Sequence, residues 1–412
     1  MPTATTLRHE PSLKRGRVFF PAGAARCIVR HTAPWLVAGC SLLVIGCATQ
    51  RLEHARSCFA TGQFAAAQAE LAKLPKGTAD RVLFLMERGT AAQAAGDYHG
   101  SINDWQEAAR LIEALDYLSV SRSSSSLVIN DRVQAFRGAP FERTLLRTFT
   151  AKSYLALGLW EDAAVEARNV VASLQNLNGF PDDAYSRYVA AFCFEMIGAY
   201  DDAALEYRAA ASLVPYLRIS DRTGAIAPAV TNPPDSSFAS VWPAPTNAAE
   251  LVCFVLIGCA SGDNEACACA NHWGPDPFAE IYAENRYLGR SYCLANTLAL
   301  RTATEARLTA IKAAKTAARV LLKDAIARQV SKEDQLLGSL AWLLLFSLET
   351  PDTRRWETLP QFLQVARVPC PADLKGYTIV FRGAGGQAIE QRVVTSPLTR
   401  HGRTIFSLCR AL

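Results

Sequence analysis

The sequence has few of the residues and none of the common motifs on which metal and nucleophilic catalysis depend. It holds six histidines in 412 residues, and none stands in a His-Glu-x-x-His pattern, which excludes zinc peptidases of that class. It also has no Gly-x-Ser-x-Gly elbow, no glycine-rich phosphate loop with its Lys-Ser/Thr, and no paired-carboxylate signature. We therefore predict no catalytic residues, no metal site and no cofactor, and a protein that is not an enzyme.

Most of the chain has no excess of positive or negative charge. Residues 47–412 contain 37 basic and 37 acidic side chains, so the net charge of +5 belongs to the first 46 residues. Nucleic-acid binding requires a concentrated basic footprint. We expect no nucleic-acid partner.

Near the N-terminus there is a short apolar stretch, Trp35 to Ile45, which is followed by Gly46 and Cys47. It is shorter than the roughly 20 residues that cross a bilayer. Basic side chains precede it, which gives the layout of an export signal. They are Lys14, Arg15, Arg17, Arg26 and Arg30. The alternatives are a short anchor, a buried helix, or a cytoplasmic protein whose start is misread.

The ending Val44-Ile45-Gly46-Cys47 resembles the lipobox of bacterial lipoproteins. This resemblance implies a signal peptide over residues 1–46, cleavage before Cys47, and lipidation of Cys47 with palmitate or a related acyl chain. Ala48 follows the cysteine, and a residue that is not acidic there implies the outer membrane, facing the periplasm. The expected membrane contact is thus the lipid on Cys47.

Four segments share the pattern Gly, any residue, an aromatic residue, two residues, and a small residue. They are Gly62, Phe64 and Ala67; Gly96, Tyr98 and Ser101; Gly158, Trp160 and Ala163; and Gly198, Tyr200 and Ala203. The first two glycines are 34 residues apart, the period of the tetratricopeptide repeat, which these segments resemble. The resemblance predicts helical hairpins over about 48–81, 82–115, 144–177 and 184–217. The alternative is a helical bundle without superhelical stacking.

The interval between the second and third repeats, and a segment nearer the C-terminus, are similar to a family of uncharacterised bacterial tetratricopeptide lipoproteins. The similarity rests on Asn130-Asp131, Phe136-Arg137-Gly138, Phe141-Glu142-Arg143 and the segment 352–360. It implies an architecture and no settled activity. We interpret Arg137, Glu142 and Arg143 as a clamp that pins a loop, with a binding site as the alternative.

The C-terminal half differs from the repeats in composition. Residues 218–249 are rich in proline and are predicted to be a linker. Residues 250–412 are predicted to be an α+β domain, with strands at 250–257, 361–368, 377–382, 387–395 and 404–409 and helices at 294–330 and 334–348. The expected fold class is mainly α: a tetratricopeptide-like superhelix over 47–217, followed by a smaller α+β domain with a short antiparallel sheet.

Two further features of this half leave alternatives open. The helix 294–330 is basic, and it lies either on a lipid surface or in solvent. Cys259, Cys267, Cys269 and His272 lie within 14 residues of one another, and they are a disulfide, a metal site or a cluster without a role.

Together these features predict a lipid-anchored cell-envelope scaffold that binds envelope proteins through the concave face of its repeats. The alternative is an envelope enzyme, or an enzyme-activating subunit, with a site in the C-terminal domain. A polar pocket beside Arg354, Arg355 and Trp356 would favour that alternative.

Overall fold

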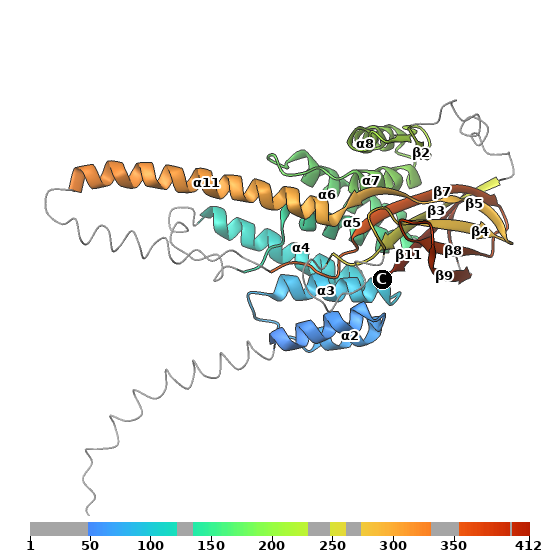
Figure 1. Ribbon diagram of the computed structural model, residues 1–412, viewed down its shortest axis with the longest axis horizontal. Coiled ribbons are helices and arrows are strands. Elements are labelled where there is room, and N and C mark those ends of the chain that lie inside the picture. The colour runs from blue at the N-terminus through green and yellow to red at the C-terminus, as the bar shows by residue number, and fades with distance from the viewer. Residues whose placement is uncertain (1–47, 122–134, 230–247, 261–272, 331–353, 396–397) are drawn as a thin grey trace, which may run out of the picture. The chain divides into compact units, whose positions relative to one another are not determined.

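A computed structural model describes residues 48–121, 135–229, 248–260, 273–330, 354–395 and 398–412 (Figure 1). Arg51–Leu412 form one compact unit, and the three described residues of the other unit, 48–50, are helical. Several predicted features lie outside the described residues. These are the signal peptide 1–46 with Cys47, the segment Asn130-Asp131, the residues Cys267, Cys269 and His272, and the helix 334–348.

The N-terminal half consists of helices that follow one another as antiparallel pairs. A first helix covers residues 48–60. It is followed by α2 (Phe64–Ala72), α3 (Arg81–Ala94), α4 (Tyr98–Ser121), α5 (Pro140–Ala156), α6 (Trp160–Gln175), α7 (Ala184–Met196) and α8 (Tyr200–Leu213).

Each pair turns at the glycine of the repeated pattern. Gly62, Gly96, Gly158 and Gly198 all have φ between 72° and 83°, a left-handed conformation that glycine adopts without a Cβ clash. The amide of the next residue donates to the carbonyl five residues earlier, as from Asp97 to Ala92 at 2.8 Å. This is the Schellman ending of a helix, and it occurs in the same form at all four turns.

Close packing within a pair depends on small side chains. Ala67, Ala163 and Ala203 are buried between helices. In the second pair, Gly89 of α3 leaves room for the ring of Trp105 on α4, whose Nε1 donates to the carbonyl of Met86 at 3.1 Å. The helices α3 and α4 therefore pack closely, because the indole of Trp105 lies directly against the backbone at Gly89.

The prediction of a mainly α fold is wrong. Of the described residues, 48% are helical and 24% are in strands, which form three sheets. The strands are β1 (Leu217–Ile219), β2 (Ile226–Pro228), β3 (Ala248–Ile257), β4 (Phe278–Ala283), β5 (Arg286–Arg290), β6 (Tyr292–Asn296), β7 (Phe362–Pro371), β8 (Gly376–Arg382), β9 (Ala388–Thr395), β10 (Thr399–His401) and β11 (Thr404–Ala411).

One hairpin that the sequence did not predict, β4 with β5, lacks the usual turn residues. β4 and β5 are joined by Glu284 and Asn285, which both have positive φ although neither is glycine. A two-residue hairpin of this kind is normally marked by Asn-Gly or Asp-Gly. The underestimate of sheet content follows in part from this unmarked hairpin.

Two sheets form a sandwich. One has the order β10-β11-β3-β7-β6 and the other β5-β4-β8-β9, while β1 and β2 pair separately. Every pairing is antiparallel except that of β11 with β3. Alternate side chains of β3, including Leu251, Cys253 and Val255, point into the core between the two sheets.

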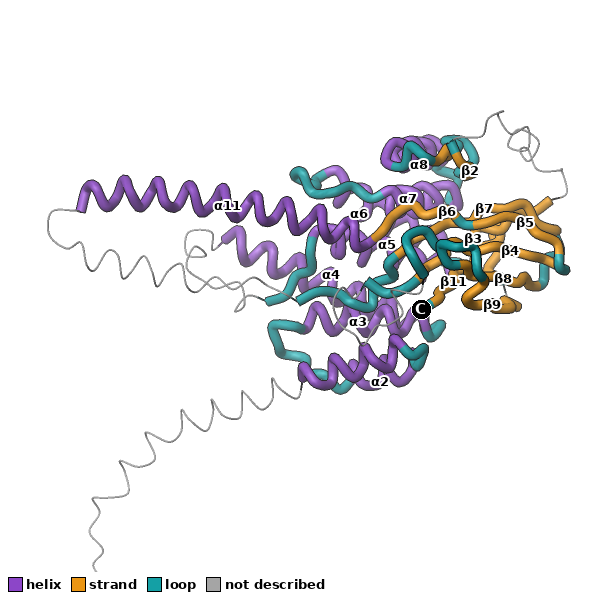
Figure 2. Tube along the Cα trace, viewed as in Figure 1, coloured by secondary structure: helices purple, strands orange, loops and turns teal. Residues whose placement is uncertain are grey.

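The other face of the five-stranded sheet is covered by the helical pairs (Figures 1 and 2). Phe254 of β3 packs against Phe192 of α7, with ring centroids 5.6 Å apart. Arg367 of β7 binds Glu195 of α7 through Nη2 and Oε1 at 2.6 Å and Glu250 of β3 at 2.6 Å. The molecule therefore has three layers, helices on sheet on sheet, and the strand β3 is buried on both faces.

A long helix, α11 (Thr297–Val330), follows β6 and packs mainly against α5 and β6. Its side chains from Thr302 to Ala313 are mostly exposed, apart from Thr304. Within the described residues, no helix combines the length and apolar character that a membrane crossing requires.

We expect Gly89→Ala to destabilise the protein by about 1–3 kcal/mol, because the new Cβ would lie 2.6 Å from Cε2 of Trp105. The higher helix propensity of alanine, worth about 1 kcal/mol, acts in the opposite direction. Gly77→Ala is the matched control, since nothing lies within 4 Å of its Cβ position. Urea unfolding of the protein measures both variants, and a Gly89→Ala variant as stable as the control would refute this packing argument.

Candidate functional site

The inner surface of the helical pairs is occupied by the chain itself. Residues Arg354–Pro360, here called the strap, precede β7 and lie against the helix 48–60, α3 and α5. Arg354 forms an ion pair with Asp80 before α3, with Nη1 and Oδ1 2.6 Å apart. The surface at which we expected a partner peptide thus binds a segment of the same molecule.

Trp356 is the anchor of the strap, and it is fully buried. Its indole lies 6.2 Å from Trp105 and 5.9 Å from Phe149, measured between ring centroids and with edge-to-face geometry. The indole Nε1 donates to Oγ1 of Thr90 at 2.9 Å. A buried indole with its N–H satisfied is a strong packing contact, so the strap is held as part of the core.

Two buried carboxylates accept hydrogen bonds from the strap backbone. Glu87 on α3 accepts from the amides of Glu357 at 3.1 Å and Thr358 at 3.2 Å. Glu142 on α5 accepts from the amide of Trp356 at 3.0 Å, and burial raises the pKa of this carboxyl group. These acceptors replace the sheet partners that the strap amides lack.

Of the three residues interpreted as a loop clamp, the two arginines share one partner and Glu142 has others. Arg137 and Arg143 both form ion pairs with Asp116 near the end of α4. Glu142 instead accepts from the amides of Ala139 and Trp356. Its side chain therefore joins the start of α5 to the strap.

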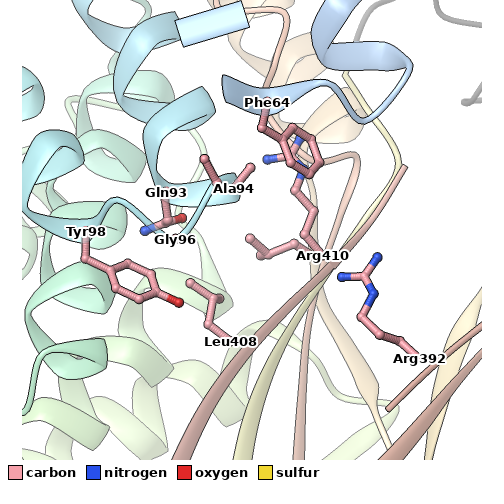
Figure 3. A pocket seen from close by; sticks show the side chains of 10 residues that line it. Phe64, Gln93, Ala94, Gly96, Tyr98, Arg392, Leu408 and Arg410 are labelled. Carbon is pink, nitrogen blue, oxygen red and sulfur yellow. The ribbon is translucent and has the colours of Figure 1, made fainter. Parts of the chain in front are cut away.

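A cleft of about 230 Å³ opens where the turns of the first two helical pairs meet the sandwich (Figure 3). Two arginines line it: Arg392 from β9 and Arg410 from β11. Its other lining residues are Phe64, Gln93, Ala94, Ala95, Gly96, Tyr98, Leu256 and Leu408. The cleft thus combines two guanidinium groups with a mixed lining of polar groups and apolar side chains.

The charges near the cleft are mostly positive. Arg410 stacks on Phe59, with its Cζ 4.6 Å from the ring centroid, and its Nη2 donates to the carbonyl of Thr358 at 2.6 Å. Arg392 forms an ion pair with Glu390. Behind the cleft, burial and then the charge of Arg410 lower the pKa of Lys152 well below its ordinary value.

Lys152 belongs to a buried polar cluster between α5 and α7. Its Nζ donates to the hydroxyl of Tyr185 at 3.0 Å and lies 3.5 Å from the ring centroid of Phe149. Asp183 caps α7 by accepting from the amide of Tyr185 at 2.9 Å, and burial raises the pKa of this carboxyl group to about 6. The repeats are therefore joined by buried polar groups as well as by apolar contacts.

The structure brings three of the repeat-pattern residues, Phe64, Gly96 and Tyr98, together in the cleft. Trp160 lies elsewhere, 4.9 Å from His401 of β10 between ring centroids. Tyr200 is 67% exposed and does not fill the space between its helices. The aromatic position of the repeat thus has three different environments.

The two arginines of the cleft were missed by the sequence analysis. Arg392 and Arg410 stand on separate strands with no motif around them, and they are 18 residues apart. Their common location results from the packing of one sheet on the other, for which the sequence holds no local signal.

Comparison with protein-family models and with curated proteins yields no match. The function is therefore argued from the geometry. Among the described residues, no group of three or more His, Cys, Asp or Glu side chains could hold a metal ion.

We expect Trp356→Ala to lower the free energy of unfolding by about 3–5 kcal/mol, since it leaves a cavity between Trp105 and Phe149. Tyr117→Ala is the control, because Tyr117 is 78% exposed and its loss should change stability by less than about 0.5 kcal/mol. Chemical denaturation of the two variant proteins compares these losses. Equal losses would mean that the strap is not part of the core.

Asp183 predicts a pH dependence of stability. Its pKa is raised in the folded state from an ordinary value of 3.8 to about 6, so its favourable contribution is present below pH 3.8 and is lost as the pH rises through 6. Asp183→Asn keeps an acceptor for the Tyr185 amide and removes the titration. Its stability relative to the wild type should increase by about 2 kcal/mol between pH 4 and pH 7.

The control for this experiment is Asp201→Asn, which removes an acid from the exposed first turn of α8. Urea unfolding at several pH values gives the two differences from the wild type. A difference for Asp183→Asn that stays constant with pH would contradict the argument.

Proposed function

We propose that the protein is a lipid-anchored scaffold of the bacterial cell envelope that binds partner proteins. The lipobox-like segment ending at Cys47 supports the anchor, and the helical repeats support the role in binding. The repeats and the sandwich belong to one compact unit. The resemblance to bacterial tetratricopeptide lipoproteins is part of this proposal, as is the location at the outer membrane.

The lining of the cleft carries the proposal. It contains two arginines, a tyrosine, a buried glutamine and apolar side chains, and no Ser, Thr, Cys, His, Asp, Glu or Lys. Gln93 already donates to the carbonyl of Phe149 at 3.2 Å and to Ser153 Oγ at 2.7 Å. Such a lining suits recognition of a charged group better than catalysis.

The nearest candidate nucleophile faces away from the cleft. Cys409 lies between Leu408 and Arg410 on β11, and the alternation of a strand sends its side chain to the opposite face. It is part of the sandwich core, beside the hydroxyl of Tyr377 at 3.2 Å. The enzyme alternative also lacks its expected pocket among the described residues, because Trp356 is fully buried against the repeats.

The proposal moves the expected partner surface. The concave face of a repeat array commonly binds partners, but here the sheet and the strap cover it. Partner binding then depends on surfaces that remain open, and the cleft beside Phe64 and Tyr98 offers both charge and a concave shape.

Site-specific photo-crosslinking in cells tests the scaffold function. We expect p-benzoylphenylalanine in place of Phe64, at the cleft, to form a discrete adduct with one or a few envelope proteins. The same replacement of Tyr287, which is 50% exposed on β5, is the control. Identical adducts at both positions, or none at either, would contradict the proposal.

A second arm of the experiment examines the anchor. Cys47→Ala should abolish processing and lipidation and release the protein from the membrane fraction. Unchanged processing and membrane association would show that Cys47 is not the lipidated residue.

A further inference from the structure

Three of the four edge strands of the sandwich are in contact with other parts of the chain. β5 continues into β6 after the single residue Ser291, so the chain itself closes that side of the two sheets. β6 is also contacted by α11 and α7. β10 is bonded to α5, where Oγ1 of Thr399 donates to the carbonyl of Ala156 at 2.8 Å. His401 of β10 packs on Trp160 of α6, so this edge is covered as well.

The fourth edge strand, β9, is open. It has eight residues, against three to five in the other edge strands. It pairs with β8, and after a bulge at Ile389 the register is regular from Glu390 to Thr395 (Figure 1). Among the described residues, no group outside β8 hydrogen-bonds to the backbone of this regular part. Every second residue there therefore presents its amide and carbonyl groups to another strand.

The side chains of β9 alternate between the two faces of the sheet. Glu390 and Arg392 pair with residues of β8 that belong to the core, so both stand on the face toward the other sheet. Gln391 and Val393 are exposed on the outer face. An acidic and a basic side chain are thus two positions apart on one face, with a neutral residue between them.

This order of charges is self-complementary. Two antiparallel copies of β9 with a two-fold axis at Gln391 place Glu390 of each copy directly opposite Arg392 of the other. Opposite charges in this position stabilise an antiparallel pair, and like charges destabilise it. Moving the axis by one residue, to Glu390 or to Arg392, would bring two like charges together. The charges therefore favour the register centred on Gln391.

We infer that a second copy of this chain binds at β9, through antiparallel pairing of the two β9 strands about a two-fold axis at Gln391. The two four-stranded sheets then form one continuous sheet, and the same surface of each copy is used. Backbone hydrogen bonds hold the strands together, as in strand addition to other open sheet edges. This inference goes beyond the proposed scaffold function, because it states how two copies of the scaffold are joined.

The contact expected at β9 is small. A single strand edge is less extensive than a standard protein interface of about 1,600 Å². Within one chain, Glu390 and Arg392 already form an ion pair, and their side chains are 33% and 45% exposed. An exposed pair of this kind is weak, so its members can exchange partners between copies. We therefore expect a dimer that dissociates on dilution.

Cysteine crosslinking in cells that express two differently tagged copies of the protein tests the register. In Gln391→Cys the two introduced thiols face each other across the axis, with Cβ atoms about 4.5–5.5 Å apart. We expect the oxidant diamide to join them in a disulfide-linked dimer that carries both tags and is separated again by dithiothreitol. The unaltered protein gives the background from the native cysteines.

Val393→Cys is the matched control for the crosslink. Val393 is on the same outer face of β9 and is 64% exposed, so its thiol is accessible to the oxidant. In the inferred register its two copies are about four residues apart along the strands, or roughly 14 Å, which is too far for a disulfide. We expect little dimer from this variant.

Charge reversal tests the pairing across the axis. Glu390→Arg and Arg392→Glu each place like charges opposite one another at two symmetric positions. In the Gln391→Cys protein we expect either reversal to lower the yield of dimer at least about threefold, and the two reversals together to restore it. Arg286→Glu on β5 is the control and should leave the yield unchanged. Denaturation curves of the variants separate loss of pairing from loss of folding.

Each outcome decides the inference. Crosslinking at Gln391 and not at Val393, with rescue by the double reversal, supports the two-fold dimer. Equal yields at the two positions, no dimer at either, or a double reversal as poor as the single ones overturns it. Crosslinking of Gln391→Cys only to a different protein also overturns it, since β9 would then receive a strand of another chain. If no dimer forms but Phe64 still gives specific crosslinks, the inference fails and the scaffold function stands.

Discussion

The burial of β3 on both faces is the constraint on which the rest of the structure depends. The strand is an almost unbroken apolar run, and its side chains alternate between two environments. Leu251, Cys253 and Val255 need the second sheet as a cover, and Phe254 needs the helices. Because neither cover alone would bury the strand, the sandwich and the repeats are expected to depend on each other for stability.

This dependence explains why the inner face of the repeats packs against the sheet. Ion pairs and hydrogen bonds reinforce the apolar contact between the layers. Arg367 on β7 joins Glu195 on α7 to Glu250 on β3, so a charge from the sheet is paired with the helices and not left buried alone. Glu87 and Glu142 likewise provide partners for buried polar groups, because they accept hydrogen bonds from the backbone amides of the strap. A repeat surface built in this way is a structural interface within the chain.

The cleft lies where this cover is incomplete. The turns of the first two helical pairs line it on one side, and Leu408 and Arg410 of β11 line it on another. Arg410 is held there by Phe59 and by the carbonyl of Thr358, so its position is set by the same contacts that close the layers. One strand thus contributes to both features: Ile405 and Cys409 of β11 are in the core between the sheets, and Leu408 and Arg410 line the cleft.

The sequence by itself determined the local elements. Three features act through contacts within a few residues or a few turns of the chain: the glycines at the four turns, the small residues between paired helices, and the apolar run of β3. Contacts of this range produce a recognisable pattern in the sequence. The hairpin at Glu284 and Asn285 produced no such pattern, because the two residues that adopt positive φ in its turn are not glycines. Only the tertiary structure decided what covers the inner face of the repeats, where Trp356 binds, and that Arg392 and Arg410 share a cleft. Those relations join residues that are far apart in the chain, and they depend on how whole layers pack, which no short pattern of residues specifies.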